Sequence, residues 1–124
     1  LAPFFQSERL EGPGDRLEVV PIDSSLLAEE AGHTDLVVNT TSLGLKRTDP
    51  SPLPATCLQP HHLVYDTIYS PPQTRLLADA ARAGARTANG LSLLLHQGVL
   101  AFNLWFPGQR PVETMRTALR EALA

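Results

Sequence analysis

Short apolar runs that end in polar residues constrain the fold of this chain more than any other feature. DLVVNT (residues 35–40) is typical of a central parallel strand covered on both faces, and HLVYDT (residues 62–67) of a second buried strand. LEVVPI (residues 17–22) and ARTA (residues 85–88) are shorter candidate strands. The chain therefore has up to four strands, each short enough for the core of a small sheet.

Helices are predicted between these strands. SSLLAEEA (residues 24–31) has Ser24 or Ser25 as its N-cap, and QTRLLADAARA (residues 73–83) lies between Ser70 as N-cap and Gly84 after its end. Between them, the proline-rich stretch 43–60 has no clear period and predicts a long loop. Strands that alternate with helices predict an α/β fold with an open parallel sheet covered by helices.

The polar strand endings predict where a ligand would bind. Residues 39–42, 66–67 and 89–90 follow the three best strand candidates, and we expect them to share one edge of the sheet. In open α/β sheets, ligands bind beyond the carboxyl ends of the strands. Hydroxyls and backbone N–H groups after residue 39 can bind phosphate, ribose or a carbonyl, although such residues also close ordinary turns.

Gln97 interrupts an apolar helix predicted from residue 91 onward. Ser92, His96 and Asn103 form a solvent stripe, whereas Gln97 is rotated away from it by about 100°. An unpaired buried amide would cost roughly 1 to 3 kcal/mol there. Its partner is either a loop or helix group, or a ligand in a cleft. The apolar residues that surround it on the helix are Leu93, Leu94, Leu100, Ala101 and Leu104.

Other chemistry-bearing residues give weaker signals. Tyr69 is either core packing or a hydroxyl donor to a substrate, and Asp66 either holds a loop or acts as a base. Gly90 permits a close backbone approach or simply a turn. His61, His62 and Cys57 lack the neighbours that a metal site or an activated thiol needs, so we predict no metal ligands.

Composition excludes several classes of partner. The 124 residues carry a formal charge of -3 without a basic stripe, so we expect neither nucleic acid nor an anionic membrane as partner. One cysteine and no apolar run of about 18 residues indicate a reducing, cytoplasmic location. Because the first residue is Leu1 and no leader pattern follows, we expect a piece of a longer protein.

Three ordered segments carry a family resemblance. DLVVNTTSLGL, LVYDTIYSPPQTRLL and NGLSLLLHQGVLAFNLW resemble successive motifs in the carboxy-terminal half of shikimate dehydrogenases. The resemblance implies a Rossmann-like parallel sheet and the reversible reduction of 3-dehydroshikimate to shikimate with NADPH, in the biosynthesis of chorismate and the aromatic amino acids.

The resemblance also implies roles for single residues. Two positions match residues that contact the shikimate substrate: Tyr69 and Gln97. Five positions match residues that line the NADP crevice or lie beside the nicotinamide: Asn39, Thr41, Ser42, Thr67 and Gly90.

The same resemblance implies two units and an incomplete catalytic set. Residues 1–90 would be a partial Rossmann-like cofactor domain, and residues 91–124 would be helices that bridge toward a second, absent domain. The family's Gly-rich turn and its catalytic lysine and aspartate precede the matching part, so we assign no catalytic residue and expect no turnover from this chain alone. Uncovered helices over residues 91–124 would favour homo-oligomers. The alternatives are a non-catalytic module that binds a partner protein, or a paralogue that uses quinate or NAD.

Overall fold

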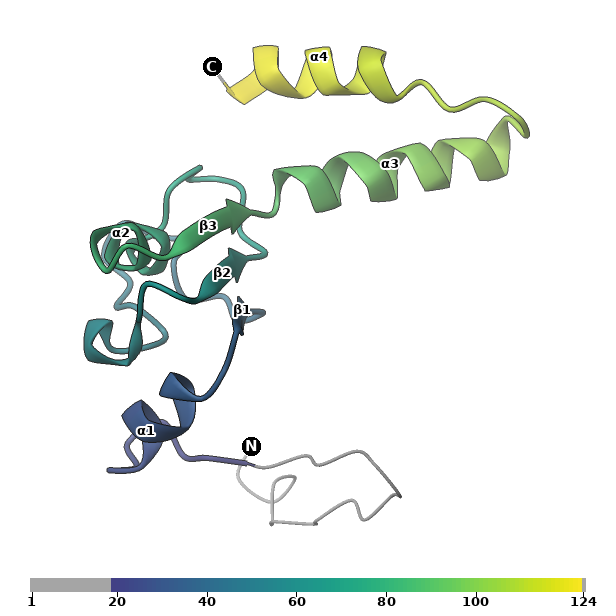
Figure 1. Ribbon diagram of the computed structural model, residues 1–124. Coiled ribbons are helices and arrows are strands. Elements are labelled where there is room, and N and C mark those ends of the chain that lie inside the picture. The colour runs from purple at the N-terminus through teal and green to yellow at the C-terminus, as the bar shows by residue number, and fades with distance from the viewer. Residues whose placement is uncertain (1–18, 124) are drawn as a thin grey trace, which may run out of the picture.

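The computed structural model describes residues 19–123 and shows a small α/β sheet followed by a helical hairpin (Figure 1). Three short strands, four α-helices and one 3-10 helix follow one another along these residues. In chain order they are α1 (Leu27–Gly32), β1 (Leu36–Asn39), η1 (Ala55–Cys57), β2 (Leu63–Asp66), α2 (Arg75–Arg82), β3 (Arg86–Asn89), α3 (Leu91–Trp105) and α4 (Val112–Leu123).

The three strands are parallel and lie in the order β1-β2-β3. Val64 of β2 has no exposed surface and packs against one face of α2. Continuous apolar runs covered by a helix form this core, as the sequence predicts, and its buried members are Leu58, Val64, Leu76, Leu77 and Ala80. The parallel α/β fold expected from the alternation of strands and helices is therefore confirmed.

One prediction for β1 is wrong within the described residues. β1 lies at the edge of the three-stranded sheet and is not a central strand. Leu36 and Val38 are 53% and 46% exposed, whereas Val37 between them packs on the core. Successive side chains of a strand point to opposite faces, and within residues 19–123 only one face of β1 is covered. An unbroken apolar run cannot by itself tell which face has a cover.

The strand predicted at residues 17–22 is absent from residues 19–22, the part of it that the structure describes. Residues 17 and 18 lie outside the described part of the chain, and residues 19–22 form irregular structure and a turn. The N–H of Ser24 donates to the Pro21 carbonyl at 3.0 Å, which closes this turn. Pro21 lacks an N–H for a sheet ladder, which accounts for the error.

Both predicted N-caps are wrong. α1 begins at Leu27 after Leu26, which gives no side-chain cap, and the Ser24 hydroxyl instead accepts from the Leu26 N–H at 3.2 Å. α2 begins after Thr74, not Ser70, because the Thr74 hydroxyl accepts from the Leu77 N–H at 3.3 Å. Threonine is a good N-cap. The serine and prolines before it belong to the connection from β2.

α3 and α4 form an antiparallel hairpin that extends away from the sheet (Figure 1). α3 starts directly after β3, and its buried side chains are Leu95 and Val99. A Cβ built on Gly98 would lie 3.9 Å from the Met115 sulfur of α4, so the helices pack closely at that point. The helices expected over residues 91–124 are found as α3 and α4 within the described residues. None of the helices within residues 19–123 has the length and apolar character needed to cross a bilayer.

Candidate functional site

The carboxyl ends of the three strands lie at one edge of the sheet, as the sequence predicts. Asn39 is in register with Asp66, and Asp66 is in register with Asn89. Each strand thus ends in a polar side chain at the same level. The edge is continuous with the start of α3, because Leu91 follows Asn89 after a single residue.

Asp66 is the centre of a hydrogen-bond network at this edge. Its side chain has no exposed surface, and its Oδ1 accepts from Asn39 Nδ2 and from the Ile68 N–H, both at 3.0 Å. Its Oδ2 accepts from the Thr74 hydroxyl at 2.6 Å. A buried carboxylate with three donors is well satisfied. Of the two roles that the sequence left open, Asp66 therefore has the one that holds neighbouring loops.

The turn after β1 is ordered by its own side chains. Asn39 Oδ1 accepts from the Thr41 N–H at 3.0 Å and from the Thr41 hydroxyl at 2.8 Å. Asn39 Nδ2 also donates to the Leu43 carbonyl at 3.1 Å, and the Leu43 N–H donates to Thr41 Oγ1 at 3.1 Å. Asn39 is 4% exposed. Both side chains are occupied with shaping the turn, whereas Ser42 beside them is exposed.

Thr67 and Gly90 lie in close contact where β2 and β3 end. The Thr67 N–H and hydroxyl both donate to the Asn39 carbonyl, at 3.1 and 2.9 Å. The Gly90 N–H donates to the Ile68 carbonyl at 3.1 Å. A Cβ added to Gly90 would lie only 1.8 Å from the Thr67 carbonyl oxygen. Of the two interpretations left open for Gly90, the close backbone approach is confirmed.

Two residues that organise this edge, Thr74 and Asn89, were not predicted to do so from the sequence. Thr74 joins Asp66 to the start of α2 and is 3% exposed. Asn89 Nδ2 donates to the Pro72 carbonyl at 2.9 Å, and Asn89 Oδ1 accepts from the Leu91 N–H at 3.2 Å. A threonine directly before an apolar helical run was the available signal for Thr74.

Tyr69 and Gln97, the two candidate substrate residues, are exposed. Tyr69 comes one residue after Ile68, whose N–H is anchored on Asp66. Gln97 lies on α3 in a row spaced by four and three residues with Leu93 and Leu100. Among residues 19–123 no hydrogen bond joins either side chain to the strand-end network.

The face of α3 that carries Gln97 is apolar and uncovered within the described residues. Leu93, Leu100 and Leu104 are 52%, 60% and 80% exposed. They repeat at intervals of seven and four residues and therefore share one helix face. Gln97 lies among leucines as predicted, but its amide is exposed and not buried within the described residues, because this helix face has no cover there. We call these three leucines together with Gln97 the bare face of α3.

Asp49 shapes the loop that continues from the turn after β1. Its Oδ2 accepts from the N–H groups of Lys46 and Gly44, at 2.9 and 3.1 Å. These backbone hydrogen bonds, that from Lys46 first, lower the pKa of the Asp49 carboxyl below its usual value. Gly44 has a φ of 115°, a conformation that favours glycine.

His62 and Cys57 are structural in the described part of the chain. His62 has no exposed surface, and its Nδ1 accepts from the Gln59 N–H at 3.1 Å. Its Nε2 therefore carries the proton and donates to the Ala31 carbonyl at 3.1 Å. Cys57 is buried. Residues 19–123 contain no group of three His, Cys, Asp or Glu side chains placed to hold a metal ion.

A parallel sheet with polar strand ends at one edge defines this chain as a Rossmann-like α/β protein. A family model described as the shikimate 5'-dehydrogenase C-terminal domain matches residues 90–120, which include all of α3. The NADP(+) shikimate dehydrogenase of Moorella thermoacetica is 45% identical over 98 residues, 78% of this chain and 33% of the relative.

Solved structures show the same likeness. Shikimate 5-dehydrogenase of Thermus thermophilus, in complex with NADP(H) and shikimate, has a TM-score of 0.70 and is 36% identical, covering 84% of this chain and 38% of that one. Quinate dehydrogenase of Corynebacterium glutamicum, in complex with NAD, has a TM-score of 0.69 and is 33% identical, covering 77% of this chain and 34% of that one.

In sequence and in fold, the chain corresponds to the carboxy-terminal part of shikimate dehydrogenases. It spans about one third of the length of the Moorella relative.

Proposed function

We propose that this chain supplies the carboxy-terminal part of an NADP-dependent shikimate dehydrogenase. The whole enzyme would reduce 3-dehydroshikimate to shikimate reversibly, within chorismate and aromatic amino acid biosynthesis. The single observation that supports this most is the register of Asn39, Asp66 and Asn89 at an edge that continues directly into α3. This edge and this helix carry the family's sequence motifs.

The edge fits an anionic nucleotide cofactor. The Asp66 carboxylate is buried and accepts three hydrogen bonds, so it is not free to oppose a phosphate at the strand ends. Hydroxyl and amide groups surround it instead. NADPH would supply a hydride when bound. Thr67 and Gly90 would contact the nicotinamide end through backbone atoms. Their close approach fixes the backbone there and requires glycine at position 90.

Three residues of the turn after β1 would line the cofactor crevice in different ways. The side chains of Asn39 and Thr41 are engaged with each other, so their role is to hold the turn in shape. Ser42 is exposed and would present its hydroxyl to the cofactor.

Tyr69 and Gln97 would contact the substrate. Both side chains are exposed, so both are free to meet a ligand. Gln97 is the polar member of the bare face of α3, where leucines surround its amide. Such a face suits the border of a cleft between two domains: the leucines would pack on the second domain, and the amide would hydrogen-bond a substrate hydroxyl.

We further propose that the chain divides at the start of α3. Residues 1–90 would form part of the cofactor domain, and residues 91–124 would bridge toward the substrate domain. The hairpin supports this division, because it points away from the sheet (Figure 1) and keeps an uncovered apolar face. The cytoplasm is the expected location of the whole enzyme.

A chimera tests this proposal. The matching carboxy-terminal part of the Moorella thermoacetica enzyme would be replaced by this chain, and NADPH oxidation by 3-dehydroshikimate would be measured. The proposal predicts turnover by the chimera and none by this chain alone. The unmodified Moorella enzyme is the positive control. A chimera that has native-like circular dichroism and cooperative unfolding would contradict it if it showed no turnover with NADPH or NADH and 3-dehydroshikimate, and none with NADP+ or NAD+ and shikimate or quinate.

The bare face also supports a second candidate, a non-catalytic module that associates through α3 and α4. Exposed leucines at positions 93, 100 and 104 resemble half of a helix interface. Self-association that rises with protein concentration in analytical ultracentrifugation, without NADP or shikimate binding, would favour it. A paralogue that uses quinate or NAD is a further alternative, and the same chimera assay with these substrates separates it.

A further inference from the structure

A pocket of about 220 Å³ lies between the end of β3, the start of α3 and one side of α4. It shares Asn89 with the strand-end edge and has no residue in common with the bare face of α3. Its apolar lining is Leu91, Leu95 and Leu119, and its polar lining is Asn89, Ser92, Arg116 and Arg120. None of these residues is among those proposed to contact cofactor or substrate.

The charge in this pocket is positive. Arg116 and Arg120 are four residues apart on α4 and therefore lie on the same side of the helix. No acidic residue of the described part of the chain lines the pocket. Arg116 Nε lies 3.4 Å from Glu113 Oε2, but the Glu113 side chain is 82% exposed, and such a surface ion pair holds its partner weakly. Both guanidinium groups can therefore take an external anion.

The amino end of α3 adds to the positive charge of the pocket. The Leu91 N–H is satisfied by Asn89 Oδ1 at 3.2 Å. Ser92, in the first helical turn, is a lining residue of the pocket. The amino end of a helix carries a partial positive charge, which adds to that of the two arginines.

We propose that this pocket binds a small organic anion, with a carboxylate or phosphate group on Arg116 and Arg120. Guanidinium groups bind either oxyanion through paired hydrogen bonds. The three leucines would contact the carbon skeleton of the ligand. The volume exceeds that of an inorganic anion, so an anion with an apolar part fits better than a bare phosphate.

Binding of phenyl phosphate and of benzoate to the chain, measured by NMR chemical-shift titration, tests the proposal. Inorganic phosphate and acetate serve as the matched probes without a ring. We expect saturable binding of the aromatic anions, tighter than that of their matched probes. The phosphate and carboxylate arms identify which oxyanion the site prefers.

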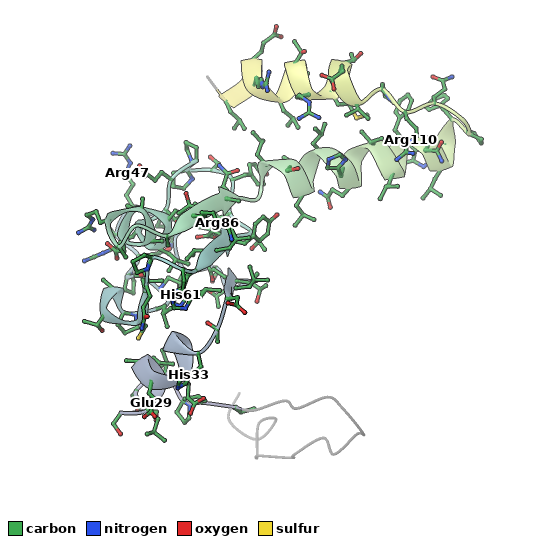
Figure 2. The ribbon with its side chains drawn as sticks, viewed as in Figure 1. Glu29, His33, Arg47, His61, Arg86 and Arg110 are labelled. Carbon is green, nitrogen blue, oxygen red and sulfur yellow. The ribbon has the colours of Figure 1, made fainter. Side chains whose placement is uncertain are left out.

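Charge-neutralising variants locate the site. Arg116→Gln and Arg120→Gln should each weaken binding about tenfold, because each removes a charge-assisted hydrogen bond. Arg110→Gln is the control, since Arg110 lies at the far end of the hairpin (Figure 2), and should leave binding unchanged. Arg120→Lys keeps the charge but not the paired geometry, so it should weaken binding less than Arg120→Gln.

Three results would overturn the proposal. The first is no saturable binding of either aromatic anion to the wild-type chain. The second is an equal loss of affinity in the Arg110 variant, which would mean general attraction to surface charge. The third is displacement of phenyl phosphate by NADP+, which would assign the arginines to the cofactor. This last result leaves the proposed dehydrogenase function standing, and the first two do not bear on it.

Discussion

The sheet edge and the α3–α4 hairpin differ in how completely their side chains are satisfied. At the sheet edge, Asp66 is fully buried and its carboxylate accepts three hydrogen bonds. On the hairpin, Leu104 and Trp105 are 80% and 75% exposed. Burial of an apolar side chain of this size is worth about 1.5 to 3 kcal/mol, so the hairpin leaves a large stabilisation unused among the described residues. The edge satisfies its polar groups internally, whereas the hairpin leaves apolar side chains uncovered among the described residues.

The largest effect is expected from Asp66→Ala. This change removes the acceptor of Asn39 Nδ2, the Ile68 N–H and the Thr74 hydroxyl, and leaves these donors in a buried site. The expected loss is about 3 kcal/mol or more of the free energy of unfolding. Urea denaturation followed by circular dichroism measures it. A loss within experimental error would show that the edge network does not hold the sheet.

Gly90→Ala is expected to cost nearly as much. Its Cβ would overlap the Thr67 carbonyl oxygen at 1.8 Å, and a backbone group cannot move aside cheaply. The expected cost is about 2 to 3 kcal/mol. Gly98→Ala on the hairpin is the matched control, because its Cβ would be 3.9 Å from the Met115 sulfur and alanine favours a helix. That variant should gain about 0.5 to 1 kcal/mol. A change of the same sign in the free energy of unfolding of both variants would contradict the difference between the sheet edge and the hairpin.

A pair of leucine truncations compares the two regions directly. Leu76→Ala removes a side chain that is 1% exposed and should cost about 2 to 5 kcal/mol. Leu104→Ala removes one that is 80% exposed and should change the free energy of unfolding by less than about 0.5 kcal/mol. Thermal and urea unfolding measure both. A large loss from Leu104→Ala would mean that the bare face is already covered, for example by a second copy of the chain.

The smallest effect is expected from protonation of Asp49. Its pKa is lowered from 3.8 because its carboxylate accepts from two backbone N–H groups in the folded state. The stabilisation is therefore present above pH 3.8 and is lost as the pH falls through the lower folded pKa. Side-chain carboxyl chemical shifts across an acid titration measure this pKa. Asp49→Asn should remove the transition, and a midpoint at or above the ordinary value would contradict the assignment.

The strand ends could be predicted from sequence because a buried parallel strand has an unbroken apolar run and a clear polar stop. Asn39 and Asp66 mark such stops, and their register follows from the parallel sheet. The start of α2 could not be predicted correctly, because Ser70 and Thr74 are both good N-caps locally. Thr74 is the cap in the structure, where its hydroxyl also reaches the carboxylate of Asp66 at the end of β2.

The candidate site was predictable only in part. The position of Gln97 among leucines follows from helical periodicity, and its exposure on the bare face agrees with a partner outside the described residues. Its proposed role as a substrate contact rests on the resemblance to the family motif. Periodicity alone cannot reveal what a helix face meets, because the energetics of that face depend on atoms far away in the sequence.

The most direct test of the account is the pair Gln97→Ala and His96→Ala in the Moorella chimera. The two side chains are neighbours on α3 and both are exposed. They therefore differ in the direction in which they leave the helix and not in burial. The account predicts that Gln97→Ala lowers kcat/KM for 3-dehydroshikimate by about tenfold or more, since one hydrogen bond to the substrate is lost, while His96→Ala leaves kcat/KM unchanged. Equal kcat/KM values in the two variants would contradict the claim that α3 borders the substrate.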